Sequence, residues 1–329
     1  MILIVDHIIN VWYTHNGERV GTYNDHNGSV WTVDVDSQSR FLLSGAADNM
    51  MKLWEASTGK CLYTWEFPTA VKRVAWSEDD KEILCVTEQR MGYQGAIRVF
   101  KVNRENPTQQ DPEPFSEFNP IGSKATVAAF SYANDIIITG HESGKVACFD
   151  VKSGEEINSN QRAHLEQVTD LQLSLDRTYF ITSSKDRSAK VRSIEYESSG
   201  LKQTKHLPTQ LHETKTLKVL KNYATDGPLN SAAIAPLRPY ILVGGGQEAM
   251  NVTTTSARQG KFETRFWHKI FEEEVGRVKG HFGPINTIAV HPSGRQYASG
   301  GEDGFVRLHQ FDDSYFKARP YGDLGEPDD

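Results

Sequence analysis

The chain has 329 residues, of which 38% are hydrophobic and 24% charged, a balance typical of a water-soluble globular protein. A net charge of −7 at pH 7, with no long basic run, argues against a broad nucleic-acid-binding surface. The cysteines, Cys61, Cys85 and Cys148, are widely spaced and form no CxxC pair. This excludes a disulfide framework and a cysteine zinc site, and it favours a reducing compartment.

The N-terminal run MILIV is apolar for only 5 residues before Asp6. This run is too short for the apolar core of a signal peptide, and no other segment has the length of a membrane span. The sequence therefore predicts a cytoplasmic protein that does not contact a membrane.

A recurring unit is first complete at residues 25–55. His26 precedes an alternating apolar segment, Ser44 lies in a second apolar run, and Asp48 follows it at a turn. A third run ends at Trp54, and a variable fourth run follows. Alternation with a period of two predicts β-strands. Four strands in about 40 to 50 residues are typical of the WD-repeat blade of a β-propeller.

The same unit recurs twice downstream, with His, hydroxyl and Asp in matching positions: His164, Thr182 and Asp186, then His281, Ser299 and Asp303. Arg192 and His309 stand where the first unit has Trp54. We expect each set to form a buried hydrogen-bond chain across strands, because a buried carboxylate needs partners. A catalytic triad uses the same residue types but would occur once, with its nucleophile at an exposed turn. We therefore interpret the recurring sets as structural.

The ends of the third strands mark seven units, at Trp12, Trp54, Phe100, Phe149, Arg192, Trp267 and His309. The predicted architecture is all-β, a seven-bladed WD40 β-propeller in a single domain. Its expected blades are 1–23 (partial), 24–66, 67–120, 121–160, 161–223, 224–279 and 280–329.

Three segments depart from the unit. In blade 3 a longer loop within 87–100 replaces the Asp turn, and the proline-rich stretch 102–120 is expected to be an exposed excursion. In blade 4 Ser143 stands in the Asp position. The segment 193–217 is long for one connection, and we interpret it as a solvated surface insertion.

The glycine-rich stretch 241–261, ILVGGGQEAMNVTTTSARQGK, suggests a nucleotide-binding enzyme as an alternative. A P-loop requires Ser or Thr directly after Gly-Lys, and then a helix that holds the phosphates. Here Phe262 follows Gly260 and Lys261, and the next residues alternate like a strand. We interpret the stretch as a widened corner in blade 6. The histidines outside the recurring sets lack paired spacing, so the sequence predicts no metal site. Because the P-loop is absent and the triad-like sets are structural, it also predicts no enzyme and no cofactor.

Four segments, 10–23, 87–95, 139–146 and 244–311, together resemble the i subunit of eukaryotic translation initiation factor 3. The resemblance implies a non-catalytic scaffold subunit of the complex that coats the small ribosomal subunit during initiation and scanning. It implies support for recruitment of mRNA and initiator tRNA through protein contacts, without direct sequence-specific binding of nucleic acid. Another WD-repeat adaptor, in signalling or complex assembly, remains the alternative.

The resemblance also implies the partners. Family members dock on the b subunit through a helix near its C-terminus, using blades 5 and 6, and contact the g subunit. In this chain Asp226 matches an acidic residue that the family places before blade 6, and we predict that Asp226 and Tyr223 contact the partner. The alternative is that Asp226 shapes a turn with Gly227.

Family members normally begin with a further strand ahead of the VWY run. Here only MILIV precedes Asp6, so blade 1 is expected to lack its first strand and blade 7 the strand that closes the ring. The segment 315–321, YFKARPY, is one candidate to supply the closure. An unpaired sheet edge is expected to lower stability relative to a complete ring.

Overall fold

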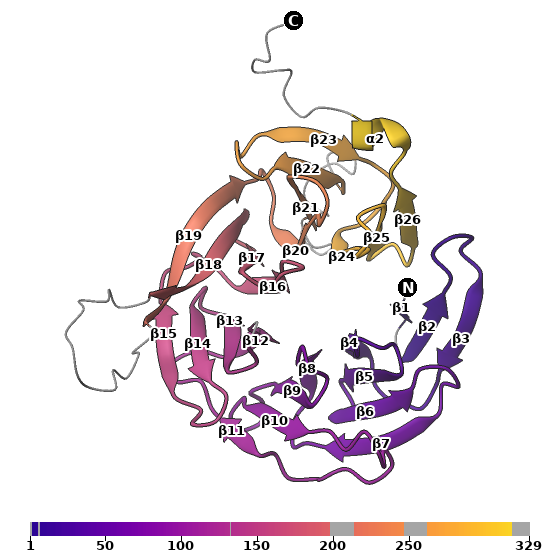
Figure 1. Cartoon of the computed structure of the whole chain (residues 1–329), viewed down its shortest axis with the longest axis vertical. Helices are drawn as coiled ribbons and strands as arrows, with labels where there is room; N and C mark the ends of the chain where they lie inside the picture. The colour runs from indigo at the N-terminus through magenta and orange to yellow at the C-terminus, as the bar shows by residue number, and fades with distance from the viewer. Residues whose placement is uncertain (1, 6, 132, 198–213, 247–261, 318–329) are drawn as a thin grey trace, which may run out of the picture.

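The computed structural model describes residues 2–5, 7–131, 133–197, 214–246 and 262–317, which form a ring of small antiparallel sheets (Figure 1). Each sheet is a meander in which strands adjacent in sequence pair with one another. We number the sheets 1 to 7 in chain order. The first strand of each sheet lies toward the centre of the ring and the last at its periphery (Figure 1).

Sheets 1 to 3 comprise β1 (Ile2–Val5), β2 (Ile8–Trp12) and β3 (Arg19–Tyr23); β4 (Val30–Val35), β5 (Phe41–Ala46), β6 (Met50–Glu55) and β7 (Cys61–Glu66); and β8 (Val71–Trp76), β9 (Glu82–Thr87), β10 (Ile97–Lys101) and β11 (Ser116–Phe118). Sheets 4 and 5 comprise β12 (Ala125–Phe130), β13 (Ile136–His141), β14 (Val146–Asp150) and β15 (Glu156–Asn160); and β16 (Val168–Leu173), β17 (Tyr179–Ser184), β18 (Ser188–Glu197) and β19 (Thr214–Ala224). Sheets 6 and 7 comprise β20 (Leu229–Ile234), β21 (Tyr240–Gly245), β22 (Thr264–His268) and β23 (Glu274–Val278); and β24 (Ile285–Val290), β25 (Gln296–Gly301) and β26 (Val306–Gln310), followed by helix α2 (Asp313–Lys317).

This architecture is an all-β WD40 β-propeller. The prediction of a seven-bladed ring with an incomplete blade 1 is met in part: sheets 2 to 6 are four-stranded blades, and sheets 1 and 7 have three strands each. Five of the predicted third-strand markers lie at the second-last residue of a third strand. Trp12 ends β2, the second strand of sheet 1, and Arg192 lies inside the longer β18. The alternating patterns were thus sufficient to place these strands.

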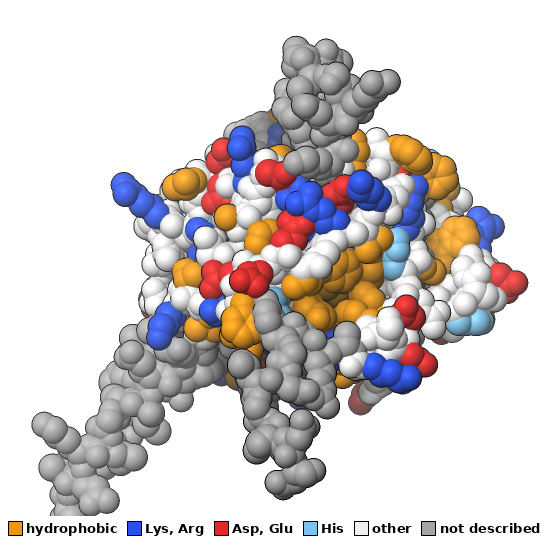
Figure 2. Space-filling model, turned by 90° about the horizontal axis from the view of Figure 1, so that it is seen from above, with side chains coloured by type: hydrophobic (Ala, Val, Ile, Leu, Met, Phe, Trp, Pro, Cys, Tyr) orange, Lys and Arg blue, Asp and Glu red, His pale blue; other side chains and the backbone are white. Residues whose placement is uncertain are grey.

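The two three-stranded sheets meet at a seam. Within the described residues, no strand pairing joins β26 to sheet 1. Residues 315–317 of the candidate closing segment belong to helix α2, so this part is not a strand, and 318–321 lie outside the described residues. Figure 2 looks onto the periphery at sheets 6 and 7 and shows apolar side chains gathered among charged ones. Phe311 stacks on Tyr315 of helix α2, with ring centroids 4.1 Å apart.

Sheet 5 differs from the sequence expectation. The segment 193–217 was predicted to be a solvated loop, but β18 continues to Glu197 and pairs with β19 from Thr214 onward. Only 198–213 lies outside the described residues. The prediction is therefore wrong at both ends of the segment. The polar composition indicated a loop, but a strand that is paired along its whole length tolerates polar residues.

The core lies between neighbouring sheets rather than within one of them. All 6 residues of β5 are buried, because both of its faces are covered. Leu43 and Leu53 of sheet 2 pack with Val71, Val74 and Ile83 of sheet 3 in one apolar cluster. Burial on both faces accounts for the continuous apolar runs of the second strands.

Neighbouring sheets approach so closely that the second strands need glycine. A Cβ on Gly45 would lie 2.5 Å from Cγ1 of Val71 in the next sheet. A Cβ on Gly140 would lie 2.5 Å from Cγ1 of Val168 in the next sheet. Since real Cβ atoms do not come this close to a neighbour, each glycine sets the distance between two sheets.

Polar side chains also link sheets that are not neighbours. Arg73 of β8 donates to the carbonyl of Leu171 in β16 at 3.3 Å, and its guanidinium lies 3.6 Å from the Asp170 carboxylate. Gln172 of β16 donates to the carbonyl of Ile288 in β24 at 2.9 Å. Sheets 3, 5 and 7 are therefore connected near the centre of the ring.

Replacing Gly140 with Ala is expected to destabilise the protein by about 1 to 3 kcal/mol, because the added methyl group forces β13 away from Val168. Urea unfolding measures the difference. Gly276→Ala in the outer strand β23 is the matched control, since a Cβ there has no neighbour within 4 Å. Equal unfolding midpoints for the two variants would contradict the proposed packing constraint.

Candidate functional site

The first recurring set lies within sheet 2 and its preceding loop. His26 Nδ1 lies 2.8 Å from the Asp48 carboxylate, and its Nε2 lies 2.7 Å from Ser44 Oγ. Trp54 Nε1 donates to the same Ser44 oxygen at 2.8 Å. A carboxylate only accepts, so Nδ1 carries the proton and Nε2 accepts the Ser44 hydroxyl. Four side chains, from β5, β6, the turn between them and the loop before β4, therefore form one directed chain.

The second and third sets have the same geometry. His164 contacts Thr182 at 2.8 Å and Asp186 at 3.1 Å. In sheet 7, His281 lies 2.9 Å from Ser299 and 3.0 Å from Asp303. In all three sets the Asp also accepts the amide proton of the residue after the His, at Asn27, Leu165 and Phe282. Each chain thus ties a turn to the loop that enters its sheet.

Arg192 and His309, which occupy the position of Trp54 in the second and third sets, make different contacts. The Arg192 guanidinium is fully buried and donates to the carbonyls of Ala163 and Leu217, at 3.0 and 3.4 Å. Burial lowers the pKa of Arg192 to about 10. His309 instead stacks on Tyr297 at a centroid distance of 4.5 Å. Neither substitute reproduces the indole-to-hydroxyl bond of Trp54.

Burial sets the protonation of these chains. Desolvation lowers the pKa of His26 and of His164, although the nearby Asp carboxylates partly oppose the shift. Burial alone would raise the pKa of Asp186, but hydrogen bonds from His164 and Ser188 outweigh it and hold that pKa well below its usual range. In the second set, the folded protein therefore favours a neutral His164 imidazole beside an ionised Asp186 carboxylate.

Sequence reasoning missed a related arrangement in sheet 4. His141 is fully buried, with Nε2 2.8 Å from Thr139 Oγ1 and Nδ1 3.1 Å from the carbonyl of Ser123. A backbone carbonyl thus takes the place of the turn Asp. The signal was the His in TGHESG, which stands on the second strand rather than ahead of the first.

These sets offer no catalytic geometry. Ser44 and Thr182 are fully buried, so neither hydroxyl can reach a substrate. Among the described residues, no group of three or more His, Cys, Asp or Glu side chains could hold a metal ion. In the same part of the chain, no helix has the length and apolar character needed to cross a bilayer.

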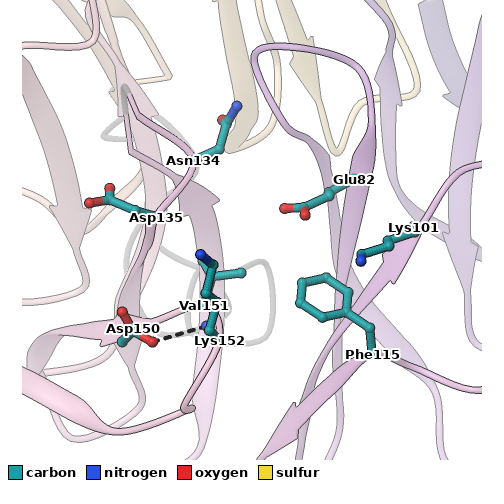
Figure 3. A pocket seen from close by; sticks show the side chains of 8 residues that line it. All are labelled: Glu82, Lys101, Phe115, Asn134, Asp135, Asp150, Val151 and Lys152. Atoms are coloured by element: carbon teal, nitrogen blue, oxygen red, sulfur yellow. Dashed lines mark hydrogen bonds between the residues drawn. The ribbon is translucent and has the colours of Figure 1, made fainter.

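A hollow of about 340 Å³ lies between sheets 3 and 4 (Figure 3). Glu82, Lys101 and Phe115 line one side, and Asn134, Asp135, Asp150, Val151 and Lys152 the other. Asp150 accepts the backbone amide of Lys152 at 3.0 Å. Burial, and then the charge of Asp79, raise the pKa of Glu82. The lining has no Ser, Cys or His, so it supplies neither a hydroxyl or thiol nucleophile nor an imidazole base.

The two residues predicted to contact a partner lie at the junction of sheets 5 and 6, in different environments. The Tyr223 side chain is fully buried; it packs against Trp267, and its hydroxyl donates to the carbonyl of Lys269 at 2.7 Å. The expectation that Tyr223 touches a partner is therefore corrected, because the neighbouring sheet covers it. Asp226 lies between β19 and β20, is half-exposed, and forms an ion pair with Arg265.

A loop that the sequence did not single out presents apolar side chains at the same junction. Between β22 and β23, the side chains of Ile270 and Phe271 are 56% and 53% exposed. His268 Nδ1 accepts the backbone amides of both residues, at 3.3 and 3.2 Å. The loop therefore holds two large apolar side chains toward solvent in a fixed position. The adjacent pair IF in HKIFEEE was the only signal in the sequence.

Asp48→Ala is expected to lower the free energy of unfolding by roughly 3 kcal/mol, because it leaves His26 and two backbone amides without their acceptor. Chemical denaturation of the purified chain measures this loss. Asp313→Ala, at an exposed position in α2, is the control and should change little. Unchanged melting of the Asp48 variant would show that the buried chain does not stabilise the fold.

Stability is expected to fall as the pH drops below about 6.5, because the unfolded chain then protonates histidines that the folded chain keeps neutral. His26, His141 and His164 have pKa values lowered mainly by burial, so their contribution is complete above that pH. Each adds a slope of up to about 1.4 kcal/mol per pH unit. Urea unfolding across this range measures the slope, which His141→Gln should reduce and the exposed His15→Gln should not.

The chain was compared with known proteins. A family model described as EIF3I matches residues 3–206, and one described as WD domain, G-beta repeat matches residues 272–310. Among solved structures, the β-propeller domain of Cps50 (Swd1) from Myceliophteria thermophila superposes with a TM-score of 0.70 at 14% identity, covering 93% of this chain and 91% of that one. At this identity the likeness concerns the fold alone.

Curated relatives extend the family match along the chain. "Eukaryotic translation initiation factor 3 subunit I" of Mycosarcoma maydis is 57% identical over 96% of this chain and 88% of its own length. The proteins of the same name from Botryotinia fuckeliana and Schizosaccharomyces pombe are 54% and 52% identical, each over 94% of this chain and over 87% and 89% of their own lengths. The chain therefore belongs to the eukaryotic translation initiation factor 3 subunit I family.

Proposed function

We propose that this protein is a non-catalytic scaffold subunit of the eukaryotic translation initiation factor 3 complex. It supports recruitment of mRNA and initiator tRNA to the small ribosomal subunit, and scanning, through protein contacts in the cytoplasm. Its partners within the complex are the b and g subunits. Family membership supports this proposal, as does the structural rather than catalytic placement of every His, Ser and Asp set described above.

We further propose that the chain is a single domain in which each of the seven sheets is one blade. Sheets 1 and 7 are then the incomplete blades of the ring. Their inner strands support this assignment, since β24 packs beside β20, and β1 packs beside β4.

The observation that carries the proposed docking site is the rigid loop between β22 and β23. Its apolar side chains, Ile270 and Phe271, stand at the junction of sheets 5 and 6, where Lys221 pairs with Glu272 at 3.0 Å. Lys269 adds a bond to the Tyr179 hydroxyl at 3.0 Å, so both sheets hold the loop. A fixed pair of exposed apolar side chains beside charged groups suits the apolar stripe of an amphipathic helix.

Asp226 supplies the second element of the proposed docking site. Its side chain is 45% exposed although it pairs with Arg265, and its negative charge suits a cationic side chain of the partner. Tyr223 supports the loop from inside. Its buried hydroxyl donates to the carbonyl of Lys269, the residue directly before Ile270 and Phe271. We therefore assign partner contact to Asp226, Ile270 and Phe271, and support of the loop to Tyr223.

The double variant Ile270→Ser, Phe271→Ser is expected to weaken binding of the purified b subunit by at least about tenfold, because two apolar contacts at the centre of the interface are lost. Isothermal titration calorimetry with the full chain measures the affinity. Asp226→Lys should weaken the same interaction through charge reversal, and its melting temperature tests for damage to the turn. Ile157→Ser on the outer strand of sheet 4, also an exposed isoleucine, is the matched control. Wild-type affinity in the double variant would refute the docking site.

A further inference from the structure

Two loops that depart from the repeat meet at one groove. A hollow of about 610 Å³ lies between sheets 3 and 4, at the opposite strand ends from the hollow of Figure 3. The β9–β10 loop forms one wall, residues 119–124 form another, and the turn at 142–143 completes it. The β9–β10 loop and the turn at 142–143 are the places where sheets 3 and 4 lack the turn Asp.

The β9–β10 loop is a rigid hairpin. The backbone amides of Arg90 and Tyr93 each donate to the other's carbonyl, at 3.2 and 3.0 Å. The central residues Met91 and Gly92 have φ angles of 53° and 87°, as in a type I′ turn. Met91 is 85% exposed at the tip. Since methionine is strained at positive φ and glycine is not, an exposed Met at this position costs stability without a contact to offset it.

The groove has neutral hydrogen-bonding groups and an apolar rim. Within the part of the chain that the structure describes, the amide side chains of Gln89, Gln94 and Asn119 make no hydrogen bond, although each can donate and accept. Ile121, which also lines the groove, is 88% exposed. The charged lining residues Lys124 and Glu142 pair with each other at 3.4 Å. The groove therefore presents no net charge to a ligand.

We propose that this groove binds an uncharged, extended peptide segment of a partner protein. Three free amide side chains match the alternating N–H and C=O groups of an extended backbone. Ile121 receives an apolar side chain of the segment, and the exposed Met91, at the tip of the loop that forms one wall, extends this apolar contact beyond the groove. Pairing of Lys124 with Glu142, and the acidic net charge of the chain, disfavour a polyanion such as RNA. This surface, between sheets 3 and 4, is separate from the docking site proposed for the b subunit, which lies at the junction of sheets 5 and 6.

The test pans a library of random peptides about ten residues long against the full chain, and then measures the selected synthetic peptides by fluorescence anisotropy. We expect uncharged sequences with one apolar anchor. Ile121→Ser and Gln94→Ala should each weaken their binding by about tenfold. Leu165→Ser, an exposed apolar residue at the corresponding ends of sheet 5, is the matched control and should bind like wild type. All variants should still bind the b subunit.

Met91→Gly separates binding from folding. It should weaken peptide binding while its melting temperature stays equal to or above that of wild type, because glycine adopts the turn without strain. Selected peptides that bind equally to wild type and to the Ile121 variant would overturn the proposal. Binding of a single-stranded oligouridylate that is lost in the same variants would assign the groove to RNA instead. Self-association lost in those variants, seen by sedimentation velocity, would make a second copy the occupant; either result overturns the peptide assignment.

Discussion

The buried hydrogen bond between a histidine and the carboxylate of a turn is the interaction on which the ring depends. In sheets 2, 5 and 7 it joins the loop that enters the sheet to the turn between the second and third strands, at His26, His164 and His281. Because the imidazole also reaches a hydroxyl on the second strand, loop, turn and strand are fixed together. Strands too short to be stable alone thereby acquire a defined geometry at one end.

Where this hydrogen bond is missing, in sheets 3 and 4, the connections at the same strand ends have a different structure. Sheet 4 replaces the carboxylate with the carbonyl of Ser123, and sheet 3 replaces the turn with the hairpin that carries Met91. Both changes leave the strands in register but alter the surface above them. The ring thus separates two roles, since paired strands maintain the fold while the connections vary and present side chains to partners.

The fold and the recurring sets could be predicted because they repeat. Spacing alone placed His26, Ser44, Asp48 and Trp54 in one chain of contacts, since a fixed offset between strands brings the same positions together in every sheet. The burial of Tyr223 could not be predicted in this way, because Trp267 and Lys269 of the next sheet cover it. The exposed pair Ile270 and Phe271 was missed for the same reason. A short apolar pair predicts a core position unless the neighbouring sheet is known.

The links from Arg73 to Leu171 and from Gln172 to Ile288 have a mechanical consequence for a ring with a seam. In a closed ring, each sheet is held by a neighbour on both sides, whereas at the seam sheets 1 and 7 are not joined by paired strands. The two polar contacts between alternate sheets, near the centre of the ring, therefore oppose opening of the ring at the seam. Sheet 7 is held in place by such a tie to sheet 5, as well as by packing against sheet 6. A seam at the rim therefore does not leave sheet 7 free to swing outward, and surfaces far from the seam keep their shape.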